Sequence, residues 1–297
     1  MFELIKHGTK IDFMGKAYYF FAFSGLLIAL SIAIMATKGF NYGIDFAGGS
    51  IIQVKFEKAP DLNTIRSVVD ELKLGETIIQ NFGTDEEVLI RVVKNDKDLK
   101  SVSDNIQIGL KEKMKDNKFE VERVEQVGPQ VGKELKKMAV YAVLYSLIGI
   151  LIYVAFRFQL IFSVAAVAAL FHDVIITMGF FSLLGKEISI SVVAAILTLV
   201  GYSLNDTIVV FDRIRETMKE DKEGKISLKD LMNLSINETL SRTIITSFLT
   251  LLTVIALYFF GGEVINGFAF ALLIGIIIGT YSSIAVASAI VYTVKKK

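Results

Sequence analysis

Residues 188–211 read ISISVVAAILTLVGYSLNDTIVVF, a stretch that has the length of a membrane-spanning helix and carries one carboxylate, Asp206. About 20 predominantly apolar residues suffice to cross the hydrocarbon core of a bilayer as an α-helix. A charged aspartate at the centre of such a helix costs about 2.5 kcal/mol or more on insertion scales. Carboxylates of this kind usually face the interior of a helix bundle and interact with ions, protons or partner charges. The stretch therefore predicts a functional site inside a membrane protein.

The composition of the whole chain agrees with a membrane protein. Of the 297 residues 53% are hydrophobic, and the mean hydropathy is +0.55. The net charge of +1 gives no overall field that would favour nucleic acid. Cysteine is absent, which excludes disulfides and thiolate metal sites, and the two histidines are too few for a histidine-based metal site. We expect no metal, no cofactor and no nucleic-acid partner.

Six apolar stretches are long enough to span a bilayer. The first is too long for a cleaved signal peptide and lacks an Ala-x-Ala cleavage site after it, so we interpret it as a retained helix. The predicted spans are residues 17–37, 138–156, 160–184, 188–210, 243–260 and 264–294. The chain then divides into a tail (1–16), the first helix (17–37), a large loop region (38–137), and helices two to six (138–297) with an amphipathic loop (212–242).

Basic residues gather in alternate short loops and predict the orientation of the chain. Cytoplasmic loops of membrane proteins carry an excess of Lys and Arg. The opposite short loops hold only Lys186, with Glu187 beside it, and Glu263. We therefore expect both termini on the cytoplasmic side of the membrane and residues 38–137 to be exported. The basic set comprises Lys6, Lys10, Lys16, Arg157, Arg213, Arg215, Lys219, Lys222, Lys225, Lys229, Arg242 and Lys295–Lys297.

The region 38–137 has the pattern of a small α+β domain. Ile52, Val54 and Phe56 alternate with polar residues, which is the period of a half-buried strand. An amphipathic helix follows, opened by Pro60 and Asp61. After it come two strand-like runs at 77–82 and 88–93, a second amphipathic helix from 99 to 114 and a strand at 119–127. The order β-α-β-β-α-β predicts a ferredoxin-like domain. The fold class is therefore an α-helical polytopic membrane protein with an exported α+β domain between its first two helices.

The loop between the fourth and fifth spans contains a helix-start signal, Ser227-Leu228-Lys229-Asp230. Apolar residues at 228, 231, 232 and 234 alternate with polar ones after it. We interpret this segment as an interfacial helix on the cytoplasmic face, with a solvated linker as the alternative.

Asp206 is the first candidate for proton transfer. Thr198, Tyr202 and Ser203 lie eight, four and three residues before it, so they form a polar stripe that leads to the carboxylate. Arg242 begins the fifth span, and an antiparallel helix pair can bring it close to Asp206. A carboxyl group that gains and loses such a contact would bind protons in a conformation-dependent way. The alternatives are one structural hydrogen bond for Asp206 and a topological anchor for Arg242.

Asp173 is a second embedded carboxylate, near the middle of the third span and next to His172. Neighbouring positions of a helix point about 100° apart, so we expect these two side chains not to share a face. A structural bond between helices and a proton-transfer role remain equally open for Asp173.

Two glycine-rich junctions join the exported domain to the helices. The first, GIDFAGGS at 43–50, carries Asp45, Gly48 and Gly49, and the second, GPQVG at 128–132, carries Gly128, Pro129 and Gly132. Glycine permits positive φ and close backbone approach, and a proline between glycines suits a hinge. The alternative is a plain connector. Neither junction has the pattern of a nucleotide-binding loop.

Four of these strings together resemble the SecF family. They are GIDFAGG (43–49), VGPQVGKEL (127–135), FHD (171–173) and GYSLNDTIVVFDRIRE (201–216), and the resemblance covers nearly the whole chain. SecF is the smaller partner of SecD in protein export, within the resistance-nodulation-division superfamily. The resemblance implies one six-helix repeat that pairs with SecD, associates with the SecYEG channel and YajC, and acts on preproteins after the SecA ATPase. Asp206 and Arg242 match the residues implicated in proton flow.

The leading hypothesis is therefore a non-enzymatic, lipid-embedded subunit that uses the proton-motive force to promote late steps of preprotein translocation. A second hypothesis makes the chain a structural subunit that stabilises SecD and the channel without proton coupling. A third, an exporter of lipids or small molecules, fits the superfamily but not the small exported domain.

Overall fold

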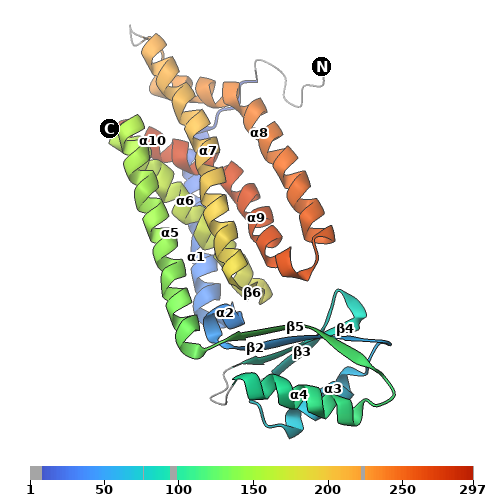
Figure 1. Cartoon of the computed structure of the whole chain (residues 1–297). Coiled ribbons are helices and arrows are strands. Elements are labelled where there is room, and N and C mark those ends of the chain that lie inside the picture. Colours follow the sequence, from blue (N-terminus) through green and yellow to red (C-terminus); the bar gives the residue numbers. More distant parts are fainter. Residues whose placement is uncertain (1–8, 76, 94–98, 222–224, 297) are drawn as a thin grey trace. The chain divides into compact units, whose positions relative to one another are not determined.

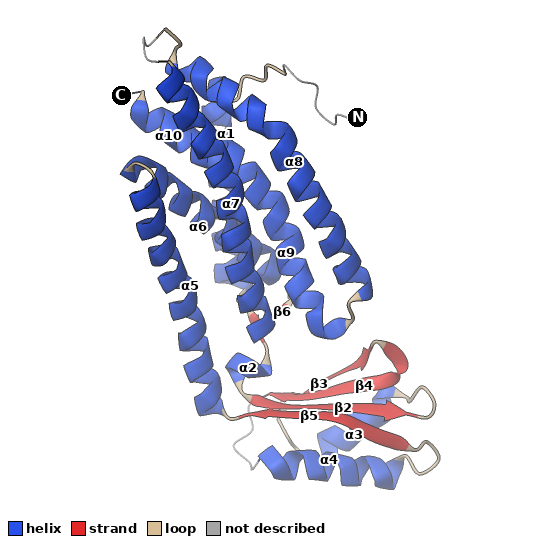
Figure 2. Cartoon of the chain, turned by 45° about the horizontal axis from the view of Figure 1, so that its top comes forward, coloured by secondary structure: helices blue, strands red, loops and turns tan. Residues whose placement is uncertain are grey.

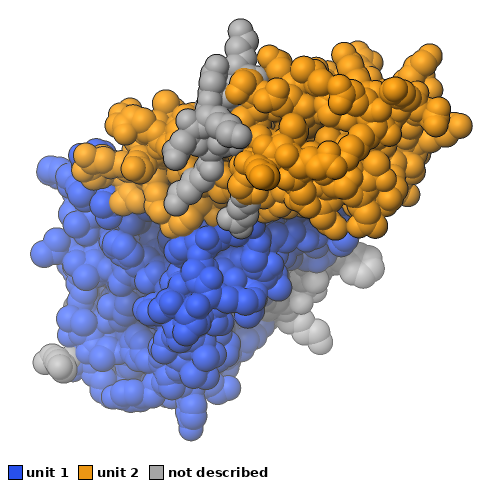
Figure 3. Space-filling view, turned by 90° about the horizontal axis from the view of Figure 1, so that it is seen from below, with its two compact units in different colours: residues 1–41, 142–297 blue, residues 42–141 orange. Residues whose placement is uncertain are grey.

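The computed structural model describes residues 9–75, 77–93, 99–221 and 225–296. The chain divides into two units, residues 1–41 with 142–297 and residues 42–141 (Figure 3). Lys6, Lys222 and Lys297, which belong to the predicted charge pattern, lie outside the described residues.

Six helical segments of the described residues are long and apolar enough to cross a membrane, as predicted. The segments are the 3₁₀ turn η1 (Met14–Lys16) with α1 (Ala17–Lys38), α5 (Pro129–Arg157), α6 (Leu160–Leu184), α7 (Ile190–Glu220), α8 (Leu228–Phe260), and α9 (Glu263–Ser282) with η2 (Ser283–Ala287) and α10 (Ser288–Lys295). In the last segment η2 is a π-helical insertion. Figure 1 and Figure 2 show these long helices, and the two-residue strand β6 (Glu187–Ile188) precedes α7.

Burial is unequal among the spanning helices. The helices α6, α7 and α9 bury about half or more of their most apolar stretch inside the chain, whereas α1, α5 and α8 leave most of theirs exposed. At one end of the unit Phe158, Phe162 and Phe211 form an aromatic cluster, with the rings of Phe162 and Phe211 4.9 Å apart. The exposed apolar surface of the remaining helices is available to lipid or to another subunit.

The segment after Ser227 differs from the prediction of a separate interfacial helix. The Ser227 side chain accepts a hydrogen bond from the Asp230 amide at 3.1 Å, so the predicted helix start is confirmed. The helix then continues without interruption to Phe260 as α8, although its first turns run in a different direction from the rest (Figure 1). Met232 and Ile236 are fully buried in the core of the helical unit. The apolar face of this segment therefore packs on protein.

The second unit is the predicted α+β region. It begins within the two-residue strand β1 (Asn41–Tyr42). It contains α2 (Ile44–Ala47), β2 (Gly49–Phe56), α3 (Leu62–Glu71), β3 (Thr77–Phe82), β4 (Thr84–Val93), α4 (Leu99–Lys113) and β5 (Phe119–Val127). The antiparallel sheet has the order β3-β4-β2-β5, which is the order of a split β-α-β arrangement. In Figure 2 both α3 and α4 lie on the same face of this sheet.

The core of this unit follows from the alternation along β2. Ile52, Val54 and Phe56 are buried and pack against Val68 of α3 and Ile106 of α4. Ile52 lies opposite Ile90 of β4. On the other side of β2, the pairing with β5 shifts its register between Gln53 and Val54. Asp61 caps α3 by accepting from the Asn63 amide at 3.0 Å. These contacts give the unit a core of its own.

Candidate functional site

Asp173 lies in the interior of the helical unit, where α6, α7 and the end of α9 meet. Its side chain is 1% exposed. One carboxylate oxygen, Oδ2, accepts hydrogen bonds from Ser203 Oγ at 2.6 Å and from Ser282 Oγ at 2.8 Å. The other oxygen, Oδ1, lies 2.9 Å from His172 Nδ1. A buried carboxylate is stable only when such partners replace water, and here three helical segments supply them.

The sequence predicts that the side chains of His172 and Asp173 do not share a face, but in the structure they form a hydrogen bond. Both side chains are buried, and the imidazole folds toward its neighbour to form the bond to Oδ1. The angular separation of two adjacent Cβ atoms does not prevent this, because both side chains are long enough to meet beside the helix. The other ring nitrogen, Nε2, is buried and has no hydrogen-bond partner among the described residues.

Asp206 lies one helical turn beyond Ser203 on α7 and belongs to a second polar group. The side chain is 2% exposed, and Oδ2 accepts a hydrogen bond from Ser247 Oγ of α8 at 3.1 Å. Ser247 Oγ in turn accepts from Thr280 Oγ1 of α9 at 2.8 Å. A chain of hydroxyl groups therefore links the carboxylate to two neighbouring helices.

Arg242 is exposed, and it is close enough to Asp206 for the two charges to interact. It lies five residues before Ser247 on α8, so the same helix carries the hydroxyl that bonds to Asp206 and a cation in its vicinity. The joint role of Asp206 and Arg242 in proton transfer stays a prediction. Thr243, the next residue, is buried with a hydroxyl that has no partner in the part of the chain that the structure describes.

The polar stripe predicted on α7 does not lead to Asp206 as expected. Ser203 donates to Asp173, and Tyr202 OH donates to Thr250 of α8 at 3.3 Å. Thr198 donates to the Ala194 carbonyl of its own helix at 2.9 Å. Tyr202 therefore contacts α8, and Ser203 contacts the Asp173 group. The helix α7 thus carries Asp206 and also bonds to Asp173.

Close packing of α7 on α9 makes these contacts possible. A Cβ atom at Gly279 would lie 3.0 Å from Ser203 Cβ and 3.5 Å from Asp173 Oδ2. Small residues at such positions let helix backbones approach and let polar side chains bond across the interface. The π-helical insertion η2 begins directly after Ser282, and such insertions occur frequently at functional sites.

The glycine-rich junctions lie against each other within the α+β unit. A Cβ atom at Gly48 would lie 2.9 Å from Pro129 Cα, and one at Gly132 would lie 3.0 Å from the Phe46 carbonyl oxygen. Pro129 is the first residue of α5, where its missing amide hydrogen removes no helical bond. Asp45 lies in the first turn of α2. The two junctions are far apart in the sequence, but in the structure they contact each other.

Sequence reasoning missed several partners of the carboxylates, chiefly Ser247, Thr280 and Ser282. For Thr280 and Ser282 the signal is the string Gly279-Thr280-Tyr281-Ser282-Ser283 in the last span, which is rich in small and hydroxyl residues. Such a run is typical of a helix that packs closely on another helix and bonds to it.

The fold and the buried polar groups define a class, the polytopic helical membrane proteins that hold titratable side chains inside the bundle. Residues 107–297 match the family model "Protein export membrane protein SecD/SecF, C-terminal", and residues 33–60 match the "SecD/SecF GG Motif". The chain belongs to the SecF family of protein translocase subunits.

The relatives cover the chain almost completely. The protein translocase subunit SecF of Calditerrivibrio nitroreducens is 60% identical over 99% of this chain and 97% of its own length. The subunit of Desulfurispirillum indicum is 50% identical over 94% of this chain and 90% of its own. The crystal structure of SecDF from Thermus thermophilus, a translocon-associated membrane protein, matches with a TM-score of 0.84 and 42% identity over 98% of this chain. This chain spans 39% of that longer protein.

The family assignment confirms a non-enzymatic, multi-pass membrane component of protein transport. It also confirms the recognition made from the four sequence strings.

Proposed function

We propose that this chain works with SecD as a proton-driven accessory subunit of the Sec translocase. Asp206 would take up and release protons as the complex changes conformation, and the exported α+β unit would help to draw a preprotein across the membrane. Movement of one charge across the membrane potential provides about 2.3 kcal/mol per 100 mV, which is enough to bias a conformational equilibrium.

The observation that carries the proposal is the environment of Asp206. The carboxylate is 2% exposed, accepts one hydrogen bond from Ser247, and lies within the field of Arg242. A buried carboxyl with few hydrogen bonds favours the protonated form, whereas a nearby cation favours the charged form. A small change in the separation of α7 and α8 would alter the balance between these two effects.

The contacts of α7 suggest how a proton at Asp206 would affect the rest of the bundle. Ser203, one turn before Asp206, donates to Asp173, which is also bonded to Ser282 at the end of α9. A shift of α7 that follows protonation of Asp206 would therefore act on the Asp173 group. We assign Asp173 a supporting part in proton transfer on this basis.

The junction residues would transmit such a shift to the exported unit. Asp45 and Gly48 precede β2, which begins at Gly49, and Gly128 precedes α5, whose first turn contains Pro129 and Gly132. The close contact of Gly48 with Pro129 supports a pivot, because a movement at one junction would change the other.

SecD would supply the other half of the membrane assembly. Transporters of repeated architecture place their coupling sites at the interface of two repeats. The exposed apolar faces of α1, α5 and α8 leave room for a partner, and the solved SecDF chain is much longer than this one. By resemblance we also propose SecYEG, SecA and YajC as associated proteins, the cell inner membrane as the location, and both termini on the cytoplasmic side.

Substitution Asp206→Asn tests the proton role. We expect export of a preprotein into inverted membrane vesicles to lose its dependence on the proton gradient, while the variant assembles with SecD at the wild-type yield. The matched control is Asp212→Asn, because Asp212 lies on the same helix but is 46% exposed and contacts Arg157 only at 3.7 Å. A full response to the gradient in the Asp206 variant would contradict the proposal.

A structural subunit without proton coupling is the second candidate function. The observation that favours it is the Asp173 group, where three partners satisfy one carboxylate and join three helical segments. In that case Asp206→Asn and Asp173→Asn would lower the yield of the complex and leave the export rate per complex unchanged. Measuring yield and rate on the same preparations distinguishes the two functions.

A further inference from the structure

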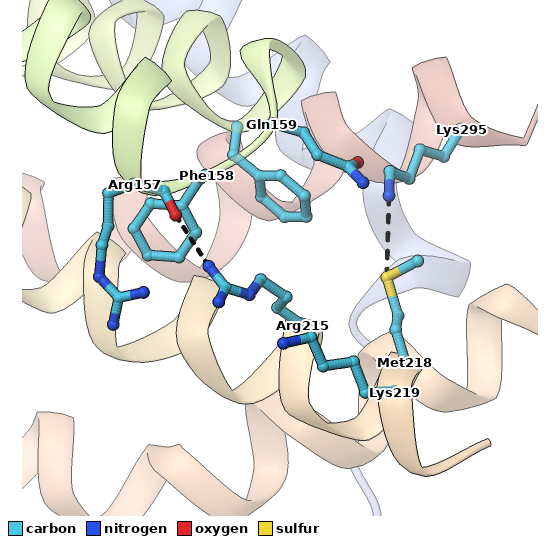
Figure 4. Close-up of a pocket in the computed structure, with 8 residues that line it drawn as sticks. Arg157, Phe158, Gln159, Arg215, Met218, Lys219 and Lys295 are labelled. Atoms are coloured by element: carbon cyan, nitrogen blue, oxygen red, sulfur yellow. Dashed lines mark hydrogen bonds between the residues drawn. The ribbon is translucent and has the colours of Figure 1, made fainter. Parts of the chain in front are cut away.

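A basic pocket of about 410 Å³ lies at the end of the helical unit where α5 turns into α6 (Figure 4). It is separate from the Asp206 and Asp173 groups. Its cationic lining consists of Arg157 from the end of α5, Arg215 and Lys219 from α7, and Lys295 from the end of α10. Elements far apart in the sequence thus contribute four positive charges to one pocket.

The charges in the pocket are only partly compensated. Arg157 is 3.7 Å from Asp212, which lies outside the pocket lining. Arg215 donates to the Arg157 carbonyl oxygen at 2.8 Å, and a carbonyl carries no full charge. Lys295 Nζ lies 3.8 Å from Met218 Sδ, a weak acceptor (Figure 4). Asp212 and Glu216 line an adjoining cavity together with Arg215 and Lys219, and Glu216 accepts a hydrogen bond from Arg213 at 2.7 Å.

Two phenylalanine rings, those of Phe158 and Phe162, also line the pocket. Phe158 is 7% exposed and Phe162 is 1% exposed. The guanidinium groups of Arg157 and Arg215 each lie 5.5 Å from the ring of Phe158, and Lys295 Nζ lies 5.0 Å from the ring of Phe162. The rings hold the cations at the rim of an apolar surface, where an anion would be attracted more strongly than in bulk water.

The surroundings of the pocket indicate a lipid as the source of that anion. Phe156 is 90% exposed and Leu160 is 69% exposed, and they flank the turn that carries Arg157, Phe158 and Gln159. Both belong to the ends of membrane-spanning segments, so apolar surface begins directly beside the basic lining. This juxtaposition suits a molecule with an anionic head and apolar chains, whereas a free soluble anion would use only the basic part.

We propose that this pocket binds the phosphate-bearing headgroup of an anionic phospholipid. Arg157, Arg215, Lys219 and Lys295 contact the phosphate, and the acyl chains run along the exposed apolar side chains beside the turn. Basic pockets between spanning helices on the cytoplasmic side are suited to anionic headgroups. The bound lipid joins the ends of α5, α7 and α10 and holds this end of the bundle together.

Native mass spectrometry of the full chain in detergent tests the proposal. The probe is short-chain phosphatidylglycerol, compared with the same concentration of short-chain phosphatidylcholine and of inorganic phosphate. We expect wild-type protein to retain phosphatidylglycerol in preference to both. Removal of one lining charge by Lys295→Gln should weaken that binding about fivefold, and Lys295→Gln combined with Lys219→Gln should weaken it about 25-fold.

The matched control is Lys296→Gln, which removes the same charge from the neighbouring residue. Lys296 is exposed and lies outside the pocket lining, so its substitution should leave the affinity at the wild-type value. Lys295→Arg should preserve binding, and the melting temperature of each variant without lipid shows whether it is folded.

Three results would overturn the proposal. Equal losses for Lys295→Gln and Lys296→Gln would mean that only diffuse positive charge attracts the lipid. Equal retention of phosphatidylcholine would mean that the pocket does not recognise anionic heads. Binding of inorganic phosphate as strong as that of phosphatidylglycerol would make the pocket a site for a soluble anion.

Discussion

Gly49 occupies a conformation and a space that no larger residue fits. Its φ is +137°, and a Cβ atom there would lie 2.2 Å from the Val92 carbonyl oxygen. We predict that Gly49→Ala lowers the free energy of unfolding by about 2 kcal/mol or more, because backbone strain adds to the displacement of β4. Thermal unfolding of the full chain in detergent, followed by circular dichroism, measures the loss.

Gly128→Ala is the control for this prediction. Gly128 belongs to the second junction, yet nothing lies within 4 Å of a Cβ atom built there. Its substitution should change stability by less than about 1 kcal/mol. Equal losses in the two variants would show that the junctions tolerate no change at all, and that the positive φ and the close Val92 carbonyl are not what restricts Gly49.

At the residue scale the sequence predicts the carboxylates but not their partners. Asp173 and Asp206 are evident because a charge stands alone in an apolar run. Their hydroxyl partners are not evident from the sequence, because most hydroxyl side chains in a spanning helix bond to the backbone of their own helix. Thr246 and Thr250 do so on the same helix as Ser247. Only the packing of α7, α8 and α9 distinguishes the serine that crosses to a neighbour.

At the scale of elements, the start of α8 has a different partner from the one the sequence predicts. Its polar face carries Lys229, Asn233 and Asn237, which are spaced four residues apart and bind the segment before α1. Asn233 Oδ1 accepts from the Met14 amide at 2.9 Å, and Asn237 Oδ1 accepts from the Ile11 amide at 3.0 Å. An amphipathic pattern indicates that a helix has one apolar and one polar face. It does not indicate whether the apolar face contacts lipid or protein.

Asp12 makes this attachment dependent on pH. The Lys229 ammonium at 2.7 Å, with the Gly15 amide and the Asn233 side chain, lowers the pKa of Asp12 from 3.8 to about 2. A lowered pKa means that the stabilisation is complete above pH 3.8 and is lost as the pH falls toward 2. We predict no change in the attachment between pH 5 and 8, and release by Asp12→Asn at neutral pH.

Hydrogen–deuterium exchange of the Met14 and Gly15 amides measures the attachment. Asp230→Asn is the control, since it removes a carboxylate from the same end of α8 that bonds to Ser227 instead. Slow exchange in the Asp12 variant at pH 7, equal to that of the wild type, would show that the asparagine bonds alone hold the segment.

At the scale of the whole molecule, the two units differ in how far the sequence predicts them. The β2, β3, β4 and β5 strands follow from alternation and turn residues, and their order follows from the β-α-β-β-α-β pattern. The packing of the spanning helices does not follow, because α1 and the part of α5 after Lys137 are apolar on all sides. Such helices carry no stripe that identifies a neighbour, so length and hydropathy predict the spans but not their contacts.

Because the α+β unit has a core of its own, we predict that residues 42–128 fold alone in water. Ile52, Ile65, Ile90 and Ile106 are completely buried within this unit. The buried guanidinium of Arg91, 3% exposed, donates to the Tyr42 carbonyl oxygen of the same unit. We expect cooperative thermal unfolding of this fragment. Ile52→Ala should lower its free energy of unfolding by about 2–5 kcal/mol, because it leaves a cavity between sheet and helices. Ile108→Ala, at a position 55% exposed on α4, should change it by less than about 1 kcal/mol. A fragment without a cooperative transition, or equal losses in the two variants, would mean that this core depends on the spanning helices.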